Sequence, residues 1–141
     1  MLTSFLATLN YWPVVVAAAA YWILGAIWFS VLFGKTWGEE LEKHGVKIKE
    51  PTKQELMMKL IQTFIWNLVV ALGVAFLVFM TNSQSVLSGI NIGLFAGVCF
   101  SAATFGIAYA WESRSVALFL VDCGYPVVGI IVCSVILSVW R

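Results

Sequence analysis

Asp122 is the residue of this sequence most able to do chemistry. It is the only Asp, Glu, Lys, Arg or His within the four long apolar stretches of the chain. A carboxylate in a membrane-spanning helix costs about 2.5–3.5 kcal/mol to insert, and such residues face the bundle interior or a water-filled cavity. Pro126 follows four residues later. Because proline has no backbone N–H, the Asp122 carbonyl lacks its helical hydrogen-bond donor, and a kink is predicted there. With Tyr125 nearby, this turn indicates a binding or proton-transfer site; the alternative is a carboxyl that only hydrogen-bonds neighbouring helices.

Two further polar side chains are expected at the depth of Asp122. Asp122 lies eight residues past Arg114, which at 1.5 Å per residue is roughly 12 Å inside the membrane boundary that Arg114 marks. The same count inward along the second and third stretches reaches Asn67 and Thr104. We therefore predict a polar layer of Asp122, Asn67 and Thr104. Because interhelical polar bonds average only about 0.6 kcal/mol, the layer is either a site or a set of contacts that defines helix register.

A ladder of small residues, spaced four apart, runs along the third apolar stretch: Gly89, Gly93, Gly97 and Ser101. Small residues at this spacing allow another backbone to approach a membrane helix closely. The ladder therefore predicts a tight helix–helix contact, which lies either within the chain or between chains.

Glu112 and Arg114 occupy the short turn between the third and fourth apolar stretches. Charged side chains in such a turn are usually solvated and contribute little energy. The alternative is that they form the mouth of the bundle and pair with Lys35, Lys59 or a bound headgroup.

Metal and cofactor chemistry has little support in the sequence. His44 is the only histidine, and the three cysteines, Cys99, Cys123 and Cys133, all lie in apolar stretches without metal-ligand spacing. A phosphate loop, a dinucleotide fingerprint and a Ser/His/Asp set are also missing. We therefore predict no metal, no cofactor, no nucleic-acid partner and no catalytic residues, so that the protein is not an enzyme.

The elements that must position these residues are membrane helices. Of the 141 residues, 62% are hydrophobic and only 11% are charged, whereas about a quarter of an average soluble domain is charged. A helix of about 20 apolar residues crosses the hydrocarbon core of a bilayer. The sequence therefore predicts an all-α integral membrane bundle, a single domain over 1–141, surrounded by lipid. Its four spans are expected at 13–33, 60–80, 89–111 and 116–140.

Local signals place the helix ends. Asn10 precedes the first span, and Gly34 is expected to end it. In the loop 34–59, capping-box patterns start at Thr36 and Thr52. The first predicts a short amphipathic helix that Gly45 stops, and the second predicts that the second membrane helix begins near Lys53.

The distribution of Lys and Arg predicts the orientation. The loops 34–59 and 112–115 hold seven of these residues and the opposite side holds only Arg141. Cytoplasmic loops carry the excess of Lys and Arg. We therefore expect both termini outside and both loops in the cytoplasm, in a prokaryotic inner or plasma membrane. The seven residues are Lys35, Lys43, Lys47, Lys49, Lys53, Lys59 and Arg114.

Two motifs resemble a known family. The first is Gly25-x-x-Trp28-Phe29-x-x-Leu32-Phe33-Gly34-Lys35-x-Trp37, and the second is Glu112-x-Arg114 followed by Leu118-Phe119-Leu120-Val121-Asp122-x-Gly124-Tyr125. Together they resemble the small four-helix membrane proteins of the domain-of-unknown-function family seventeen sixty-one, over nearly the whole chain. That family commonly has Asn or Asp at the position of Asp122 and Tyr at that of Tyr125. The resemblance implies the fold and carries no established activity.

Two functions remain open. The first is a small homo-oligomeric pore or carrier of unknown substrate, with Asp122, Asn67 and Thr104 lining the path. The alternative is an accessory or scaffold protein that assembles through the small-residue ladder and neither transports nor catalyses. A membrane enzyme ranks last, because a single buried carboxylate does not make a catalytic set.

Overall fold

The computed structural model describes residues 1–140, and every regular element within them is a helix. Arg141, which the orientation prediction counted on the outer side, lies outside the described residues. In chain order the elements are α1 (Leu2–Thr8), α2 (Tyr11–Ile27), η1 (Trp28–Leu32), α3 (Gly34–Lys43), α4 (Lys53–Met80), α5 (Val86–Ala96), η2 (Gly97–Ala102), α6 (Ala103–Glu112) and α7 (Val116–Val139). Here η denotes a π-helical turn.

Four of the helical segments are long and apolar enough to cross a membrane. They are Tyr11–Leu32, Lys53–Met80, Val86–Glu112 and Val116–Val139. The predicted spans 13–33, 89–111 and 116–140 coincide with three of them to within about three residues, the usual scatter of helix ends. The second segment begins at Lys53, ahead of the predicted span 60–80, as the capping pattern indicated. The chain thus has the four apolar helices of the predicted all-α membrane fold.

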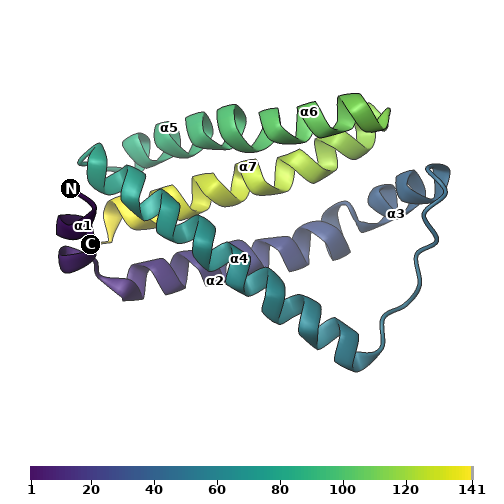
Figure 1. Cartoon of the computed structure of the whole chain (residues 1–141), viewed down its shortest axis with the longest axis horizontal. Coiled ribbons are helices and arrows are strands. Elements are labelled where there is room, and N and C mark those ends of the chain that lie inside the picture. The colour runs from purple at the N-terminus through teal and green to yellow at the C-terminus, as the bar shows by residue number, and fades with distance from the viewer. Residues whose placement is uncertain (141) are drawn as a thin grey trace.

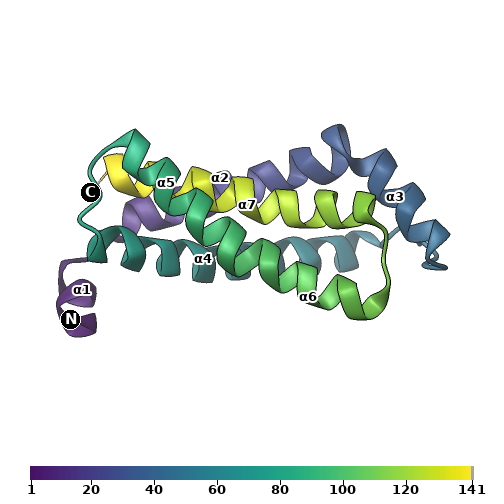
Figure 2. The ribbon, with the colours of Figure 1, turned by 90° about the horizontal axis from the view of Figure 1, so that it is seen from above.

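The long helices are arranged around α7. This helix packs against α2, α4 and α5, whereas α4 and α5 barely touch each other. Figures 1 and 2 show α5 and α6 along one side of α7 and α2 along another, with α4 crossing the bundle. The shared core lies where the helices cross, and it includes small residues that let backbones approach: Ala17, Ala18, Ala71, Ala75 and Cys133.

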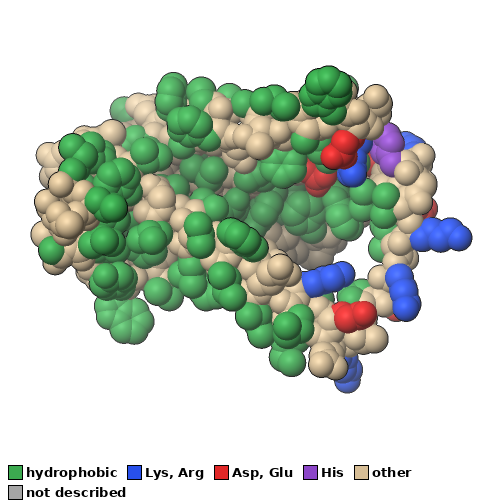
Figure 3. Space-filling model, in the orientation of Figure 1, with side chains coloured by type: hydrophobic (Ala, Val, Ile, Leu, Met, Phe, Trp, Pro, Cys, Tyr) green, Lys and Arg blue, Asp and Glu red, His purple; other side chains and the backbone are tan. Residues whose placement is uncertain are grey.

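The two ends of the bundle differ in chemistry. At one end, which we call the termini end, lie both α1 and the C-terminal end of α7 (Figures 1 and 2). The opposite end, which we call the charged end, holds α3, the connector 44–52 and the turn at Ser113. In the view of Figure 3, the charged side chains gather at this charged end. The four apolar helices run between the two ends.

Side-chain caps account for several helix ends. The Asn10 side chain accepts a hydrogen bond from the backbone N–H of Trp12 at the start of α2. Thr52 and Glu55 form the predicted capping box at the start of α4. After α3, Gly45 adopts a φ of +78°, a conformation that suits glycine. These ends confirm the local predictions because caps depend only on neighbouring residues.

The start of α3 corrects the prediction of a capping box at Thr36. The helix begins two residues earlier, at Gly34, after Phe33 leaves the helical region with φ −126° and ψ 5°. The Trp37 N–H bonds the Phe33 carbonyl, so Thr36 lies inside the first turn and cannot act as its cap. Glu39 instead lies 3.9 Å from the Lys35 ammonium.

Two π-helical turns, η1 and η2, interrupt the first and third membrane segments. A π-turn inserts an extra residue into the helical repeat and rotates every side chain that follows. Through η1 and the break at Phe33, the chain continues from α2 into α3 along the same side of the bundle (Figure 1). Neither π-turn is predicted from the sequence.

Candidate functional site

Asp122 is held by aromatic side chains from two other helices. Its Oδ1 accepts a 3.0 Å hydrogen bond from the indole Nε1 of Trp37 on α3. Its Oδ2 accepts a hydrogen bond from the phenol of Tyr109 on α6. Because Asp122 belongs to α7, this half-buried carboxylate joins three helices at the charged end. We call Asp122, Trp37 and Tyr109 the carboxylate clamp.

The turn between α6 and α7 covers the Tyr109 side of the clamp. The guanidinium of Arg114 lies over the Tyr109 ring, 5.5 Å from its centroid. A cation on an aromatic face is worth about 0.5–1 kcal/mol when exposed. The same guanidinium forms an ion pair with Glu112, while Ser113 between them adopts the left-handed conformation. Glu112 and Arg114 therefore pair with each other, and Lys35 pairs with Glu39 instead of with this turn.

Polar contacts join the C-terminal end of α3 to the start of α7. The Ser115 hydroxyl donates a 2.5 Å hydrogen bond to Oε2 of Glu40, and the Ser115 N–H donates to Nε2 of His44 at 3.1 Å. Lys43 approaches the other Glu40 oxygen at 2.6 Å. The hydrogen bond from Lys43, and then that from Ser115, holds the pKa of the Glu40 carboxyl below its usual value. The same Lys43–Glu40 bond raises the pKa of Lys43.

An apolar contact lies between the clamp and this polar contact. Leu41 of α3 is buried against Leu118 of α7 and Tyr109 of α6. The side chains of Trp37 and Phe119 pack around them. Helix α3 is therefore docked on α6 and α7 by both polar and apolar contacts.

The two sequence motifs that resemble the family pack directly against each other. The indole Nε1 of Trp28 donates a 3.0 Å hydrogen bond to the Val121 carbonyl. The Trp28 ring also occupies the space above Gly124, where a Cβ atom would lie 2.8 Å from it. In the same way Trp37, near the end of the first motif, bonds Asp122 in the second. The motif residues thus build one helix–helix interface.

Tyr125 continues this interface one turn further along α7. A Cβ atom on Gly25 would lie 2.8 Å from the Tyr125 oxygen, so only glycine leaves room for the ring. The ring packs against Phe29 and Tyr21, with centroids 5.4 and 4.9 Å apart. Its hydroxyl accepts a 3.4 Å hydrogen bond from the buried Asn67 of α4. Tyr125 therefore connects α4 to the first motif.

The predicted polar layer of three residues does not form as such. Asp122 bonds Trp37 and Tyr109, whereas Asn67 bonds Tyr125. Thr104 is exposed, and its hydroxyl donates to the Phe100 carbonyl of its own helical segment. Counting residues gives the depth of Thr104 but not the direction in which its side chain points. That direction depends on the π-turn η2, which precedes Thr104. The inclusion of Thr104 in the layer was therefore wrong.

The small-residue ladder packs within the chain. Added Cβ atoms at Gly89, Gly93 and Gly97 would lie 2.5–3.0 Å from the backbone Cα atoms of Val135, Ile131 and Val127 on α7. Ser101, after most of η2, is only partly buried. Of the two alternatives, contact within the chain is the one observed at these glycines, because α7 of the same chain occupies their face.

The types of two aromatic residues carry a signal for the partners of Asp122. In the sequence, Trp37 ends the first motif and Tyr109 lies just ahead of the second. Both carry a polar hydrogen on an aromatic ring, the donor type that buried Trp and Tyr use to bond a partner. Pro126 lies buried within α7 as expected, but the kink predicted there stays a prediction.

The side chains around the carboxylate clamp form hydrogen bonds and packing contacts. Within residues 1–140, no group of three or more His, Cys, Asp or Glu side chains could hold a metal ion. Cys123 and Cys133 are buried, and the Cys133 thiol donates to the Ala17 carbonyl.

Comparison with known proteins agrees with the resemblance seen in the motifs. No curated protein and no solved structure matches the chain. One family does match, over residues 12–138, and its description is "Protein of unknown function (DUF1761)". The match includes both motifs and all of the four apolar helices except Tyr11 and Val139. The chain therefore belongs to the DUF1761 family.

Proposed function

We propose that this protein is a membrane scaffold or accessory protein that neither transports nor catalyses. The observation that carries the proposal is the carboxylate clamp, in which each side-chain oxygen of Asp122 accepts a hydrogen bond from a protein donor. An intramembrane carboxylate is a functional site by default. Here its bonds to Trp37 and Tyr109 favour a structural role, that of holding α3 against α6 and α7.

The exposed face of α3, the helix that this clamp holds, is charged. The docked face of α3 carries Trp37 and Leu41, while Lys35 and Glu39 on other faces are exposed. This pattern favours a short amphipathic helix at the cytoplasmic boundary. With the excess of Lys and Arg in 34–59, it supports cytoplasmic loops, external termini and a location in a prokaryotic inner or plasma membrane. A rigid charged surface of this kind suits a protein partner or a second copy of the chain in a homo-oligomer.

The first experiment tests transport. Parent protein, Asp122→Asn and Trp37→Phe are reconstituted in lipid vesicles, and proton and alkali-cation flux are measured from about pH 5 to about pH 8. We expect all three to match protein-free vesicles. Flux through the parent that Asp122→Asn abolishes would overturn the proposal in favour of the pore or carrier.

The second experiment tests the scaffold role directly in cells. A photoreactive amino acid replaces Lys35 or Glu39 on α3, and as a matched control it replaces Ile23, an exposed apolar residue of α2. We expect discrete protein adducts from the α3 positions, and fewer of them when Asp122→Leu weakens the docking of α3. An adduct of twice the chain's mass identifies a second copy as the partner. Lipid adducts alone from the α3 positions contradict the scaffold role.

A further inference from the structure

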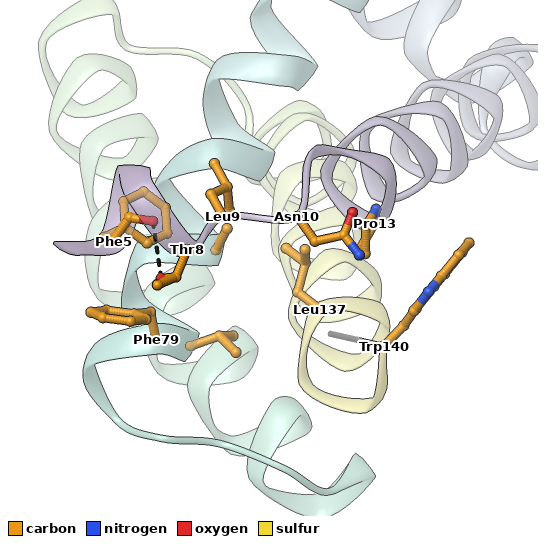
Figure 4. A pocket seen from close by; sticks show the side chains of 10 residues that line it. Phe5, Thr8, Leu9, Asn10, Pro13, Phe79, Leu137 and Trp140 are labelled. Carbon is orange, nitrogen blue, oxygen red and sulfur yellow. Dashed lines mark hydrogen bonds between the residues drawn. The ribbon is translucent and has the colours of Figure 1, made fainter. Parts of the chain in front are cut away.

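A half-open pocket lies at the termini end of the bundle, opposite the carboxylate clamp. Its volume is about 380 Å³, within the range of about 300–1,000 Å³ typical of small-molecule sites. Figure 4 shows Phe5, Thr8 and Phe79 on one side of it and Leu137 and Trp140 on the other. It belongs to none of the sequence motifs.

The wall of the pocket is apolar and depends on α1. Phe5 is the one buried residue of α1, and its ring contacts those of Phe76 and Phe79 on α4 at centroid distances of 5.2 and 5.5 Å. The pocket is also lined by Pro13 of α2, Ala75 and Val78 of α4 and Leu137 of α7. A hydrocarbon group would therefore be surrounded by side chains of four helices.

The rim of the pocket is polar and uncharged. Of the lining residues, Thr8, Asn10 and Trp140 are exposed polar or indole side chains, and they form this rim. The Asn10 carboxamide oxygen accepts from the Trp12 N–H, so the two N–H groups of this amide remain its donors to a ligand. Amide and indole donors suit a neutral acceptor such as an ester carbonyl, and none of the residues lining this pocket is Asp, Glu, Lys or Arg.

The position of the rim matches the boundary of a bilayer. Tyr11, Trp12 and Trp140 are exposed at the ends of α2 and α7. Aromatic residues concentrate at the level of lipid headgroups. Beside them, Leu2 and Leu6 of α1 are exposed one helical turn apart, as in a helix that lies in this interface. The polar rim is therefore at headgroup level, and the apolar wall extends toward the hydrocarbon core.

We propose that this pocket binds one acyl chain of an ester-linked bilayer lipid. The chain lies between α1, α2, α4 and α7, and its ester carbonyl accepts hydrogen bonds from Asn10 and Trp140. The combination of an apolar wall, neutral donors at the rim and a position at the bilayer boundary favours this occupant over a soluble metabolite.

The test uses photo-crosslinking in vesicles. The protein is reconstituted in phosphatidylethanolamine and phosphatidylglycerol that includes a phosphatidylglycerol with a diazirine at the end of one ester-linked chain. Adducts are then mapped by mass spectrometry. We expect them to concentrate on Val78, Phe79 and Leu137. Equal labelling of lipid-facing residues elsewhere, such as Ile65 and Phe95, would mean ordinary surrounding lipid and overturn the proposal.

Two variants make the test specific. Thr8→Trp fills the rim and should reduce adducts in the pocket about tenfold, a change that corresponds to about 1.4 kcal/mol. Thr3→Trp places the same side chain elsewhere on α1 and should leave the adducts unchanged. A circular-dichroism melt checks that Thr8→Trp folds. Equal adduct yields from the two variants contradict the proposal.

The recognition of the carbonyl is tested separately, with a variant that keeps the helix cap. Serine caps helices about as well as asparagine, so Asn10→Ser retains the start of α2 but removes the amide donors. The parent should prefer the ester-linked probe to its ether-linked analogue, and Asn10→Ser should lose this preference. Equal labelling of the parent by the ester and ether probes would contradict the proposal. So would a loss of pocket adducts that added free fatty acid causes and added bilayer lipid does not.

Discussion

The indole of Trp37 donates a 3.0 Å hydrogen bond to the carboxylate of Asp122, across 85 positions of the chain. This contact brings Trp37, the last residue of the first motif, to Asp122 in the second. Asp122, the strongest candidate for chemistry in the sequence, thus bonds side chains of two other helices. We expect the following variants to alter this contact and the packing around it.

Replacing Trp37 by Phe should destabilise the protein by about 1–3 kcal/mol, because the ring is kept while the donor to a polar, half-buried carboxyl is lost. The measurement is unfolding in mixed detergent micelles. Trp66→Phe is the matched control, since Trp66 is 62% exposed and should change stability by less than about 0.5 kcal/mol. In an Asp122→Leu background, Trp37→Phe should cost less than in the parent. Equal costs in both backgrounds would contradict the clamp.

Gly93→Ala and Gly73→Ala should have opposite effects on stability. A Cβ at Gly93 would meet the Ile131 Cα at 2.5 Å, whereas nothing lies within 4 Å of a Cβ at Gly73. Overpacking of this kind typically costs about 1–3 kcal/mol. At the open site, alanine should stabilise the helix by about 0.5–1 kcal/mol. The measurement is the melting temperature of each variant. Similar changes of melting temperature in the same direction would mean that α5 does not pack on α7 through this ladder.

The docking of α3 should weaken at acidic pH. The folded pKa of Glu40 lies below its usual value of 4.5 because of the bonds from Lys43 and Ser115. A depressed carboxyl pKa stabilises the docked state fully above the undocked pKa, and this contribution is lost as the pH falls through the folded pKa. Hydrogen exchange of the α3 amides should therefore accelerate as the pH drops below about 4.5, after correction for the intrinsic exchange rate.

Glu40→Gln should remove this acid dependence, whereas Glu39→Gln should keep it, because Glu39 bonds neither Ser115 nor the docked face. A Glu40→Gln protein whose α3 still loosens at the same pH would show that another group governs the docking.

The membrane orientation is tested by single cysteines at opposite ends of the bundle. Lys47→Cys and Gln84→Cys, in a Cys99→Ser background, should react with a membrane-impermeant reagent from opposite faces, with Lys47→Cys protected in intact cells. Gln84 is exposed in the segment 81–85 between α4 and α5. Reaction of both cysteines from one face would exclude four spans.

The sequence by itself determined the four apolar helices, because a bilayer requires each span to satisfy its own backbone hydrogen bonds. It also determined local features such as the caps at Asn10 and Thr52, which depend on a few neighbouring residues. The depth of Asp122 could be counted as well, since each helical residue advances the chain by a constant distance.

Only the tertiary structure decided which side chains meet. Residue counting placed Thr104 beside Asp122, yet Thr104 is exposed and the actual partners are Trp37 and Tyr109. The rotation of each helix depends on the π-turns and on the close approach of backbones at residues such as Gly93. It results from packing among several helices at once, so it could not be derived from the spacing of residues along any single helix.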